Sequence, residues 1–129
     1  MPHVLFDITG RRAIVTGGTR GLGHGVAEGL LEAGAKVVIF GTSAKAESVA
    51  ADFRARGFDC QGLKVNIASH EERVEGFSKA VELLGGLDIL VNAAGIQRRY
   101  PCEQFPLEDW NDVLEVNLTA PFELSQLAA

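Results

Sequence analysis

Short apolar runs and amphipathic stretches alternate along this chain, and glycines mark most of the changes between them. Apolar or β-branched runs predict four strands, of which the third is the weakest, at 13–15, 36–40, 61–67 and 87–92. Apolar residues three or four positions apart predict amphipathic helices within 26–31, 46–53, 69–84 and 110–118. Strands that alternate with helices in this way form a parallel sheet with right-handed crossovers, so the pattern predicts an α/β fold.

The third of these helices has the clearest local signals. Ser69 and Glu72 have the spacing of a capping box, and Gly85 follows the last turn. The apolar stripe predicted to face the sheet consists of Val74, Phe77, Val81 and Leu84.

The turn after the first predicted strand is the strongest candidate for a binding site. Its sequence is Thr16-Gly17-Gly18-Thr19-Arg20-Gly21-Leu22-Gly23. Gly17 permits a tight turn, because glycine adopts a positive φ without steric cost. Gly21 and Gly23 lack a Cβ, so a pyrophosphate can approach the N–H groups at the helix N-terminus, where the dipole favours anions. Between a strand and a helix, this turn predicts a dinucleotide phosphate site rather than an ordinary loop.

The composition narrows the class of protein. The chain has 129 residues, 47% hydrophobic and 22% charged, which fits one globular domain. A net charge of -5 argues against nucleic-acid binding but allows one small phosphate pocket, and no apolar stretch is long enough to span a membrane. The segment 1–10 lacks a signal-peptide pattern, and Cys60 and Cys102 lack metal-ligand spacing, which predicts reduced thiols and a cytoplasmic protein. His3, His24 and His70 also lack ligand-spaced partners, so no metal site is predicted.

Three motifs resemble one enzyme family. The spacing Thr16-Gly17-x-x-x-Gly21-x-Gly23 resembles the coenzyme loop of the short-chain dehydrogenases/reductases. Asn92-Ala93-Ala94-Gly95 resembles the turn after that family's fourth strand, and Val116-Asn117-Leu118 resembles the helix that carries its catalytic asparagine. The resemblance covers essentially the whole chain. Within the family, 95–99 and 109–113 are most similar to the gluconate 5-dehydrogenase and 2-deoxy-gluconate 3-dehydrogenase branch.

The resemblance implies a Rossmann-type doubly wound sheet with strand order 3-2-1-4 and a dinucleotide coenzyme at its carboxyl edge. In this arrangement Thr16 would support the glycine turn. Asn66 and Ile67 would flank the adenine, with the Asn66 amide oxygen in place of the family's usual aspartate. The residues after the fourth strand would lie against the ribose, although the small residues of both turns also suit close helix-on-strand packing. The implied coenzyme residues are Thr16, Gly17, Thr19, Arg20, Gly21, Leu22, Gly23, Thr42, Ser43, Asn66, Ile67, Asn92, Ala93, Ala94 and Gly95.

The turn after the second predicted strand bears on the choice of coenzyme. Gly41 occupies the position of the family's aspartate, which binds the ribose 2′-hydroxyl of NAD and repels a 2′-phosphate. Arg20 resembles the basic residue that pairs with the 2′-phosphate in NADP-dependent members, with a solvated side chain as the alternative. Thr42 and Ser43 add hydroxyl donors, although many NADP enzymes have a second arginine at the Thr42 position. The resemblance therefore implies NADP in preference to NAD.

Three further residues resemble parts of the family's reaction site. Asn117 corresponds to the asparagine that anchors the water of the proton relay. Pro121 lies four residues on and has no N–H for the Asn117 carbonyl, which leaves this oxygen free for a water, or else produces only a helix kink. Arg98 and Arg99 could bind a sugar-acid carboxylate; the alternative is that they make subunit contacts or face water.

The family's serine and Tyr-x-x-x-Lys pair have no counterpart here. The only tyrosine is Tyr100, and Gln104 stands at the lysine position. We therefore expect 1–129 to be a single, truncated coenzyme-binding domain, inactive alone, of an NAD(P)-dependent oxidoreductase for a sugar acid or a related alcohol or ketone. The alternative is a stand-alone nucleotide-binding or protein-interaction module. The apolar fourth strand would form an open sheet edge and the last helix an exposed face, which predicts a homo-oligomer.

Overall fold

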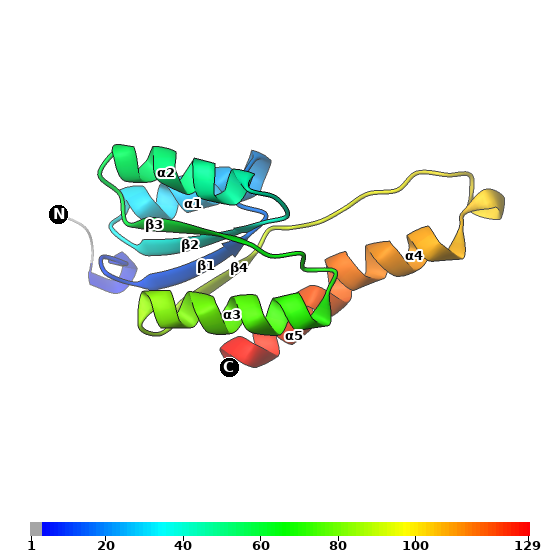
Figure 1. Ribbon diagram of the computed structural model, residues 1–129. Helices are drawn as coiled ribbons and strands as arrows, with labels where there is room; N and C mark the ends of the chain where they lie inside the picture. Colours follow the sequence, from blue (N-terminus) through cyan, green and yellow to red (C-terminus); the bar gives the residue numbers. More distant parts are fainter. Residues whose placement is uncertain (1–3) are drawn as a thin grey trace.

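Four parallel strands form one sheet at the centre of the molecule (Figure 1). The computed structural model describes residues 4–129, and the strands are β1 (Arg12–Thr16), β2 (Lys36–Gly41), β3 (Cys60–Lys64) and β4 (Ile89–Asn92). Their spatial order is β3-β2-β1-β4. Thr16 lies opposite Phe40 on one side and Asn92 on the other, so the carboxyl ends of three strands meet at one edge. The predicted Rossmann-type arrangement is confirmed.

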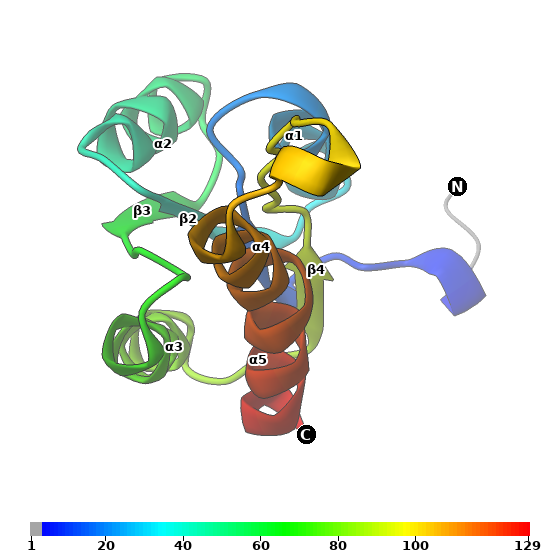
Figure 2. The ribbon, with the colours of Figure 1, turned by 90° about the vertical axis from the view of Figure 1, so that its right-hand side faces the viewer.

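Helices cover both faces of this sheet (Figure 2). On one face lie α1 (Gly21–Glu32) and α2 (Lys45–Ala55), and on the other lie α3 (His70–Leu84) and α5 (Ala120–Ala128). Before α5, the chain forms α4 (Leu107–Leu114) and a π-helical segment, η3 (Glu115–Thr119). Two short 3-10 turns, η1 (Val4–Phe6) and η2 (Cys102–Gln104), complete the elements.

Each face of the sheet has its own apolar core. Ile14 packs with Phe77 of α3 and Leu124 of α5, whereas Val15 packs on the opposite face with Phe53 of α2. Neighbouring strand residues therefore serve different cores, which explains why the strands are continuously apolar rather than alternating.

The signals at the ends of α3 act as predicted, with one difference. The Ser69 hydroxyl accepts a hydrogen bond from the Glu72 N–H at 3.3 Å, and Gly85 ends the helix in the left-handed conformation, with a φ of 77°. The Glu72 carboxylate does not return to Ser69. It accepts from the N–H of Asn66 at 3.0 Å and so holds the β3–α3 turn.

One element boundary differs from the sequence prediction. β3 ends at Lys64, before Asn66 and Ile67, because its partner β2 ends at Gly41 and offers no further ladder groups. The last helix continues past residue 118 and through Pro121 to Ala128. The wider π-helical bond from the Ala120 N–H to the Glu115 carbonyl lies directly before the proline and accommodates it without a break.

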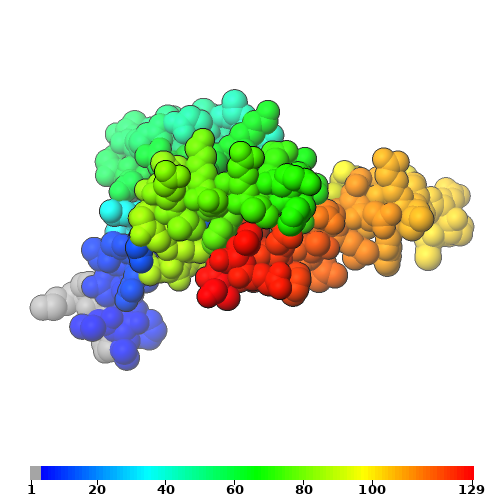
Figure 3. Space-filling view, turned by 60° about the horizontal axis from the view of Figure 1, so that its bottom comes forward, coloured from blue at the N-terminus to red at the C-terminus, as the bar shows by residue number. Residues whose placement is uncertain are grey.

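An arm of the chain projects beyond the sheet. Figure 1 shows the segment between β4 and α4 running away from the strands and returning through α4. In the space-filling view the arm forms one end of an elongated molecule, whereas α5 lies along α3 (Figure 3). At its start, Ala94 and Ile96 pack against the core on the α3 and α5 face, and the arm borders the carboxyl edge of the sheet.

Candidate functional site

A cleft of about 700 Å³ opens at the carboxyl edge of the sheet. Its walls come from the glycine turn, the ends of β2 and β3, the turn after β4, and the α4–η3 helix. The residues that line it are Gly17, Thr19, Arg20, Gly21, Leu22, Gly23, Phe40, Gly41, Thr42, Val65, Asn66, Ile67, Ala68, Ala93, Ala94, Gly95, Ile96, Arg98, Asp112 and Val116.

The glycine turn packs closely against backbone atoms at two of its glycines. Gly17 has a φ of 63°, and a Cβ there would lie 2.7 Å from the Ala94 Cα. A Cβ on Gly23 would lie 2.1 Å from the Gly17 carbonyl oxygen. Both glycines are therefore required, because the turn folds over the start of α1 and against the turn after β4.

The N-terminus of α1 offers uncapped donors to the cleft. Its N-cap residue is Arg20, and no side chain caps the helix. The first backbone bond of the helix runs from the His24 N–H to the Arg20 carbonyl at 3.3 Å, so the N–H groups of residues 21–23 precede it. These donors stand at the positive end of the helix dipole, an arrangement suited to an anion such as a pyrophosphate.

Thr16 supports a different turn from the one predicted. Its buried hydroxyl accepts from the N–H groups of Ala93 and Ala94, each at 3.1 Å, and lies 3.4 Å from the Val91 carbonyl oxygen. Because Thr16 lies opposite Asn92 in the sheet register, its side chain reaches the turn after β4 rather than the glycine turn. Thr16 thus fixes the cleft wall indirectly and is not itself a lining residue.

The β3–α3 turn forms the wall opposite the arm. The Asn66 amide oxygen accepts from the Ala68 N–H at 3.1 Å, which stiffens the turn and leaves one lone pair for another donor. Ile67 is buried and lines the cleft beside Asn66. The structure therefore brings both predicted adenine residues to one wall.

The end of β2 has a packing reason for its glycine. A Cβ on Gly41 would lie 2.7 Å from Cγ2 of Thr19 and 3.1 Å from Cβ of Ala46. The Thr19 methyl group thus fills the space that a larger residue 41 would need. Thr42 and Arg20 are exposed in the cleft wall, whereas the Ser43 hydroxyl is turned toward α2 and accepts from the Lys45 N–H at 3.2 Å.

Asn117 clamps the strand-exit segment. Its side-chain oxygen accepts from the Ile96 N–H at 2.9 Å, and its side-chain nitrogen donates to the Ile96 carbonyl, also at 2.9 Å. Both ends of the amide are therefore used by one backbone residue. Ile96 itself lies in the cleft wall.

Beside the cleft lies an apolar hollow of about 770 Å³ beneath the arm. It shares Ile96 and Arg98 with the cleft, and Trp110, Phe105 and Leu114 are among its apolar walls. The Arg98 Nε lies 3.6 Å from the Asp109 carboxylate, and hydrogen bonding to that carboxylate raises the pKa of Tyr100.

The two arginines of the predicted substrate site are therefore not equivalent. Arg98 lines both spaces, whereas Arg99 lines neither and lies beside the side-chain amide of Gln97. Only Arg98 is placed to meet a ligand that enters the hollow from the cleft.

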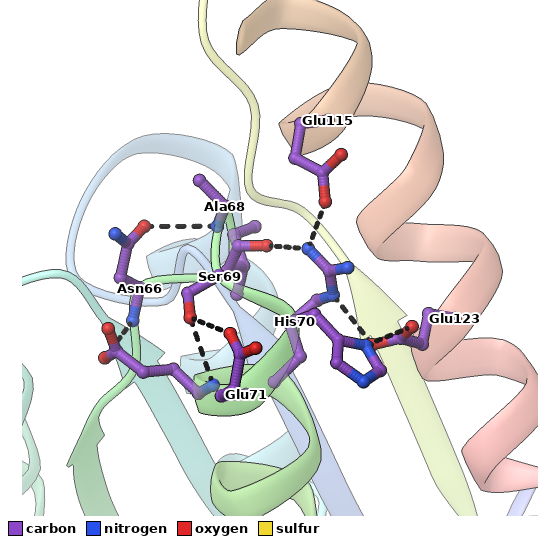
Figure 4. A network of polar contacts seen from close by, with 10 residues as sticks. Asn66, Ala68, Ser69, His70, Glu71, Glu115 and Glu123 are labelled. Atoms are coloured by element: carbon purple, nitrogen blue, oxygen red, sulfur yellow. Dashed lines mark hydrogen bonds and ion pairs between the residues drawn. The ribbon is translucent and has the colours of Figure 1, made fainter.

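A buried arginine behind the cleft was not foreseen from the sequence. Arg73 of α3 is 2% exposed, and its Nη1 donates to the Ile67 carbonyl at 2.6 Å and to the Glu115 carboxylate at 2.7 Å. Its Nε donates to Glu123 at 3.0 Å, and Glu123 also contacts His70 Nδ1 at 2.7 Å (Figure 4). Burial disfavours the charged guanidinium, but the bonds to Glu123 and Glu115 outweigh it, so the pKa of Arg73 is raised and that of Glu123 lowered.

The cleft brings together most of the predicted coenzyme residues. Thr16, Ser43 and Asn92 stand outside its walls. Sequence reasoning missed six lining residues besides Gly41: Phe40, Val65, Ala68, Ile96, Asp112 and Val116. For Phe40 and Val65 the signal was their position at strand ends, where ligands bind in open parallel sheets. Val116 had no such signal, because its orientation depends on the π-helical turn.

Within residues 4–129 no three His, Cys, Asp or Glu side chains gather as a possible metal site; His3 lies outside the described residues. None of the helices in the described part of the chain has both the length and the apolar character needed to cross a membrane. Cys60 and Cys102 are unpaired, and burial raises the pKa of the Cys60 thiol to about 12.

The fold and the cleft together define a dinucleotide-binding α/β domain. The chain belongs to the short chain dehydrogenase family, whose model matches residues 11–129.

Named relatives agree with this membership. Gluconate 5-dehydrogenase of Gluconobacter oxydans is 37% identical over 126 residues, which are 97% of this chain and 49% of that protein. The 3-oxoacyl-(acyl-carrier-protein) reductase FabG of Aquifex aeolicus is 40% identical over 121 residues, which are 92% of this chain and 49% of that protein. A gluconate 5-dehydrogenase from Burkholderia cenocepacia, solved with NADP and tartrate, superposes with a TM-score of 0.87 at 39% identity, covering 96% of this chain and 50% of that one. The chain spans about half the length of the curated relatives it matches.

Proposed function

We propose that this chain forms the coenzyme-binding portion of an NADP(H)-dependent oxidoreductase. The observation that carries the proposal is the uncapped N-terminus of α1, which faces a cleft whose closest backbone approaches are made by glycines. Membership of the short chain dehydrogenase family adds support, as does the solved relative that holds NADP. When bound, NADP(H) supplies or accepts a hydride; this chain's residues bind and orient it.

The lining residues assign a part of the coenzyme to each wall. The N–H groups of residues 21–23 bind the pyrophosphate, and Asn66 and Ile67 contact the adenine. Ala93, Ala94 and Gly95 lie against the ribose on the other side. Thr42 and the exposed Arg20 contact the 2′-phosphate, and Gly41 places no carboxylate there to repel it.

The hollow beside the cleft is the proposed substrate side. Arg98 offers a guanidinium to a carboxylate, and the solved relative with tartrate supports a hydroxy acid such as a sugar acid. A related alcohol or ketone is the broader class, because a relative of similar identity is named as an acyl-carrier-protein reductase. A cytoplasmic location, with its reducing conditions, agrees with the two unpaired cysteines.

Titration of the 129-residue chain with NADPH and NADH tests the proposal. We expect binding of NADPH in preference to NADH, without turnover of gluconate, because the given sequence contains no Tyr-x-x-x-Lys pair. Arg20→Ala should weaken NADPH binding by about 1–3 kcal/mol, the scale of one charge-assisted hydrogen bond, and leave NADH nearly unchanged.

Three results would contradict parts of this proposal. Equal losses for both coenzymes would assign Arg20 to the fold of the loop. Turnover above a no-protein control would refute inactivity of the isolated chain. No binding of either coenzyme would refute the coenzyme function and favour the protein-interaction module.

A further inference from the structure

Arg73 is the most buried charged side chain of the described residues. A guanidinium removed from water costs several kcal/mol unless its donors are satisfied, and an apolar side chain of similar size would avoid this cost. Arg73 meets the cost with acceptors from three different elements: the Ile67 carbonyl, Glu115 and Glu123. The contacts add polar links between parts of the molecule that also share the apolar core around Phe77 and Leu124.

Two of these acceptors belong to the coenzyme cleft or border it. Ile67 lies in the wall formed by the β3–α3 turn, and its carbonyl is the 2.6 Å acceptor of Arg73. Glu115 is the first residue of η3, and the next residue, Val116, lines the opposite wall. Nη1 of Arg73 therefore contacts a residue that lines one wall and the neighbour of a residue that lines the other (Figure 4).

The same π-helical segment carries the clamp on the strand-exit segment. Asn117, two residues after Glu115, holds the backbone of Ile96 through both ends of its amide. A π-helical turn is less regular than an α-helix, so its orientation depends on outside contacts. The Arg73–Glu115 ion pair supplies such a contact from behind the cleft.

We propose that Arg73 is a positioning residue for the coenzyme cleft: its guanidinium sets η3 relative to the β3–α3 turn, and η3 in turn fixes Ile96 through Asn117. The proposal rests on the proposed function for its effect on coenzyme binding. Its effect on Ile96 is independent of any coenzyme. The planar guanidinium suits this role because its donors point in fixed directions.

The two acidic partners of Arg73 separate positioning from plain stability. Glu115→Ala removes the contact with η3, whereas Glu123→Ala removes contacts with α5 and with His70. The Glu123 side chain is 20% exposed and the Glu115 side chain 37%, so Glu123→Ala should lower the melting temperature at least as much as Glu115→Ala. We nevertheless expect NADPH affinity to fall about tenfold for Glu115→Ala, the scale of a bond to a charged group, and less than about twofold for Glu123→Ala.

Arg73→Met and Arg54→Met form a second pair of variants for comparison. Arg54 of α2, like Arg73, donates to a backbone carbonyl, that of Cys60 in β3 at 2.8 Å, and to a carboxylate, that of Glu47. It lies at the other end of β3, away from the cleft. Arg73→Met should weaken NADPH binding, measured by energy transfer from Trp110, the only tryptophan, and Arg54→Met should not. If Arg73→Met fails to fold, Glu115→Ala carries the test.

Amide hydrogen exchange without coenzyme gives a readout that does not depend on the proposed function. The Ile96 N–H is held through Asn117, whereas the Ala94 N–H is held by Thr16 of β1. Glu115→Ala should speed amide exchange at Ile96 about tenfold, with no comparable change at Ala94. Glu123→Ala should leave the ratio of the Ile96 and Ala94 exchange rates unchanged.

The possible outcomes separate the two proposals. Selective loss of protection from amide exchange at Ile96 supports the positioning role. It does so even if the unmodified chain fails to bind NADPH and the proposed function is thereby refuted. Equal changes at Ile96 and Ala94, or NADPH affinities that follow melting temperature across all four variants, would overturn it and leave Arg73 a stabilising residue only.

Discussion

Replacing Gly23 by alanine should disturb the cleft more than any other one-carbon change in α1. The added Cβ would lie 2.1 Å from the Gly17 carbonyl oxygen and 2.8 Å from its carbon, whereas real Cβ contacts below 3.0 Å are essentially not found. Because both obstacles are backbone atoms, the turn must move from the helix by roughly 1 Å. Overpacking of this kind costs about 1–3 kcal/mol, which lowers the melting temperature by roughly 4–12 °C for a chain of this size.

The same movement should weaken coenzyme binding. Displacing the turn moves the N–H groups of residues 21–23 away from the pyrophosphate position, so we expect the NADPH dissociation constant to rise at least about tenfold, or about 1.4 kcal/mol. Thermal unfolding by circular dichroism and a fluorescence titration well below the melting temperature measure the two effects.

Two other glycines provide matched controls. A Cβ on Gly25, also in α1, meets no atom within 4 Å, so Gly25→Ala should stabilise the helix by about 0.5–1 kcal/mol and leave binding unchanged. A Cβ on Gly62 would lie 2.2 Å from the Ala46 carbonyl oxygen, and neither residue lines the cleft, so Gly62→Ala should destabilise the fold with less effect on binding than Gly23→Ala. Equal affinity losses for Gly23→Ala and Gly62→Ala would refute the local explanation, as would unchanged affinity of Gly23→Ala.

Two further predictions concern the sheet and its edge. Hydrogen bonds from Arg12 lower the pKa of Asp88 to about 2, so the stabilising effect of the Asp88 carboxylate should be present above about pH 4 and lost as the pH falls toward 2. The difference in melting temperature between the unmodified chain and Asp88→Asn should therefore disappear over that pH range. A difference that does not change with pH would contradict this. We also expect self-association, because β4 is an open edge strand and Phe122 is 63% exposed on α5. Light scattering at tens of micromolar should show an oligomer that Ile89→Lys or Phe122→Glu weakens, and a stable monomer of the unmodified chain would refute it.

The parts of the structure that the sequence predicted rest on local patterns. The strand order was implied by the family resemblance, whereas the four strands, the α3 cap at Ser69 and the glycine turn follow from apolar period and from residues within one turn of one another. A positive φ at Gly17 follows from the chemistry of a single residue. These features could be predicted because no distant residue is needed to define them.

The predicted apolar stripe of α3 is confirmed for Phe77, Val81 and Leu84, which pack in or against the core, but is wrong at Val74. Val74 is 39% exposed, and the buried residues of the helix are Arg73, Gly76, Phe77 and Ala80. The helical period allowed either residue 73 or residue 74 beside Phe77, and apolar content favoured Val74. An arginine in line with Phe77 and Ala80 was the available signal of a buried ion pair, but its partners lie 42 and 50 residues away.

The side-chain contacts of Thr16, Asn117 and Arg73 were not predicted from the sequence, for one common reason. The predicted coenzyme contacts in the glycine turn use backbone N–H groups, which depend on where a turn allows close approach and so can be read from glycine spacing. These three side chains instead bond backbone or carboxylate groups brought near by the fold: the Ala93 and Ala94 amides, both backbone groups of Ile96, and the carbonyl of Ile67. Each fixes one wall of the cleft against another element. Backbone groups at the glycine turn therefore define what the cleft can bind, whereas tertiary polar contacts hold its walls at the required separation. Only the backbone groups of the turn can be predicted from local sequence.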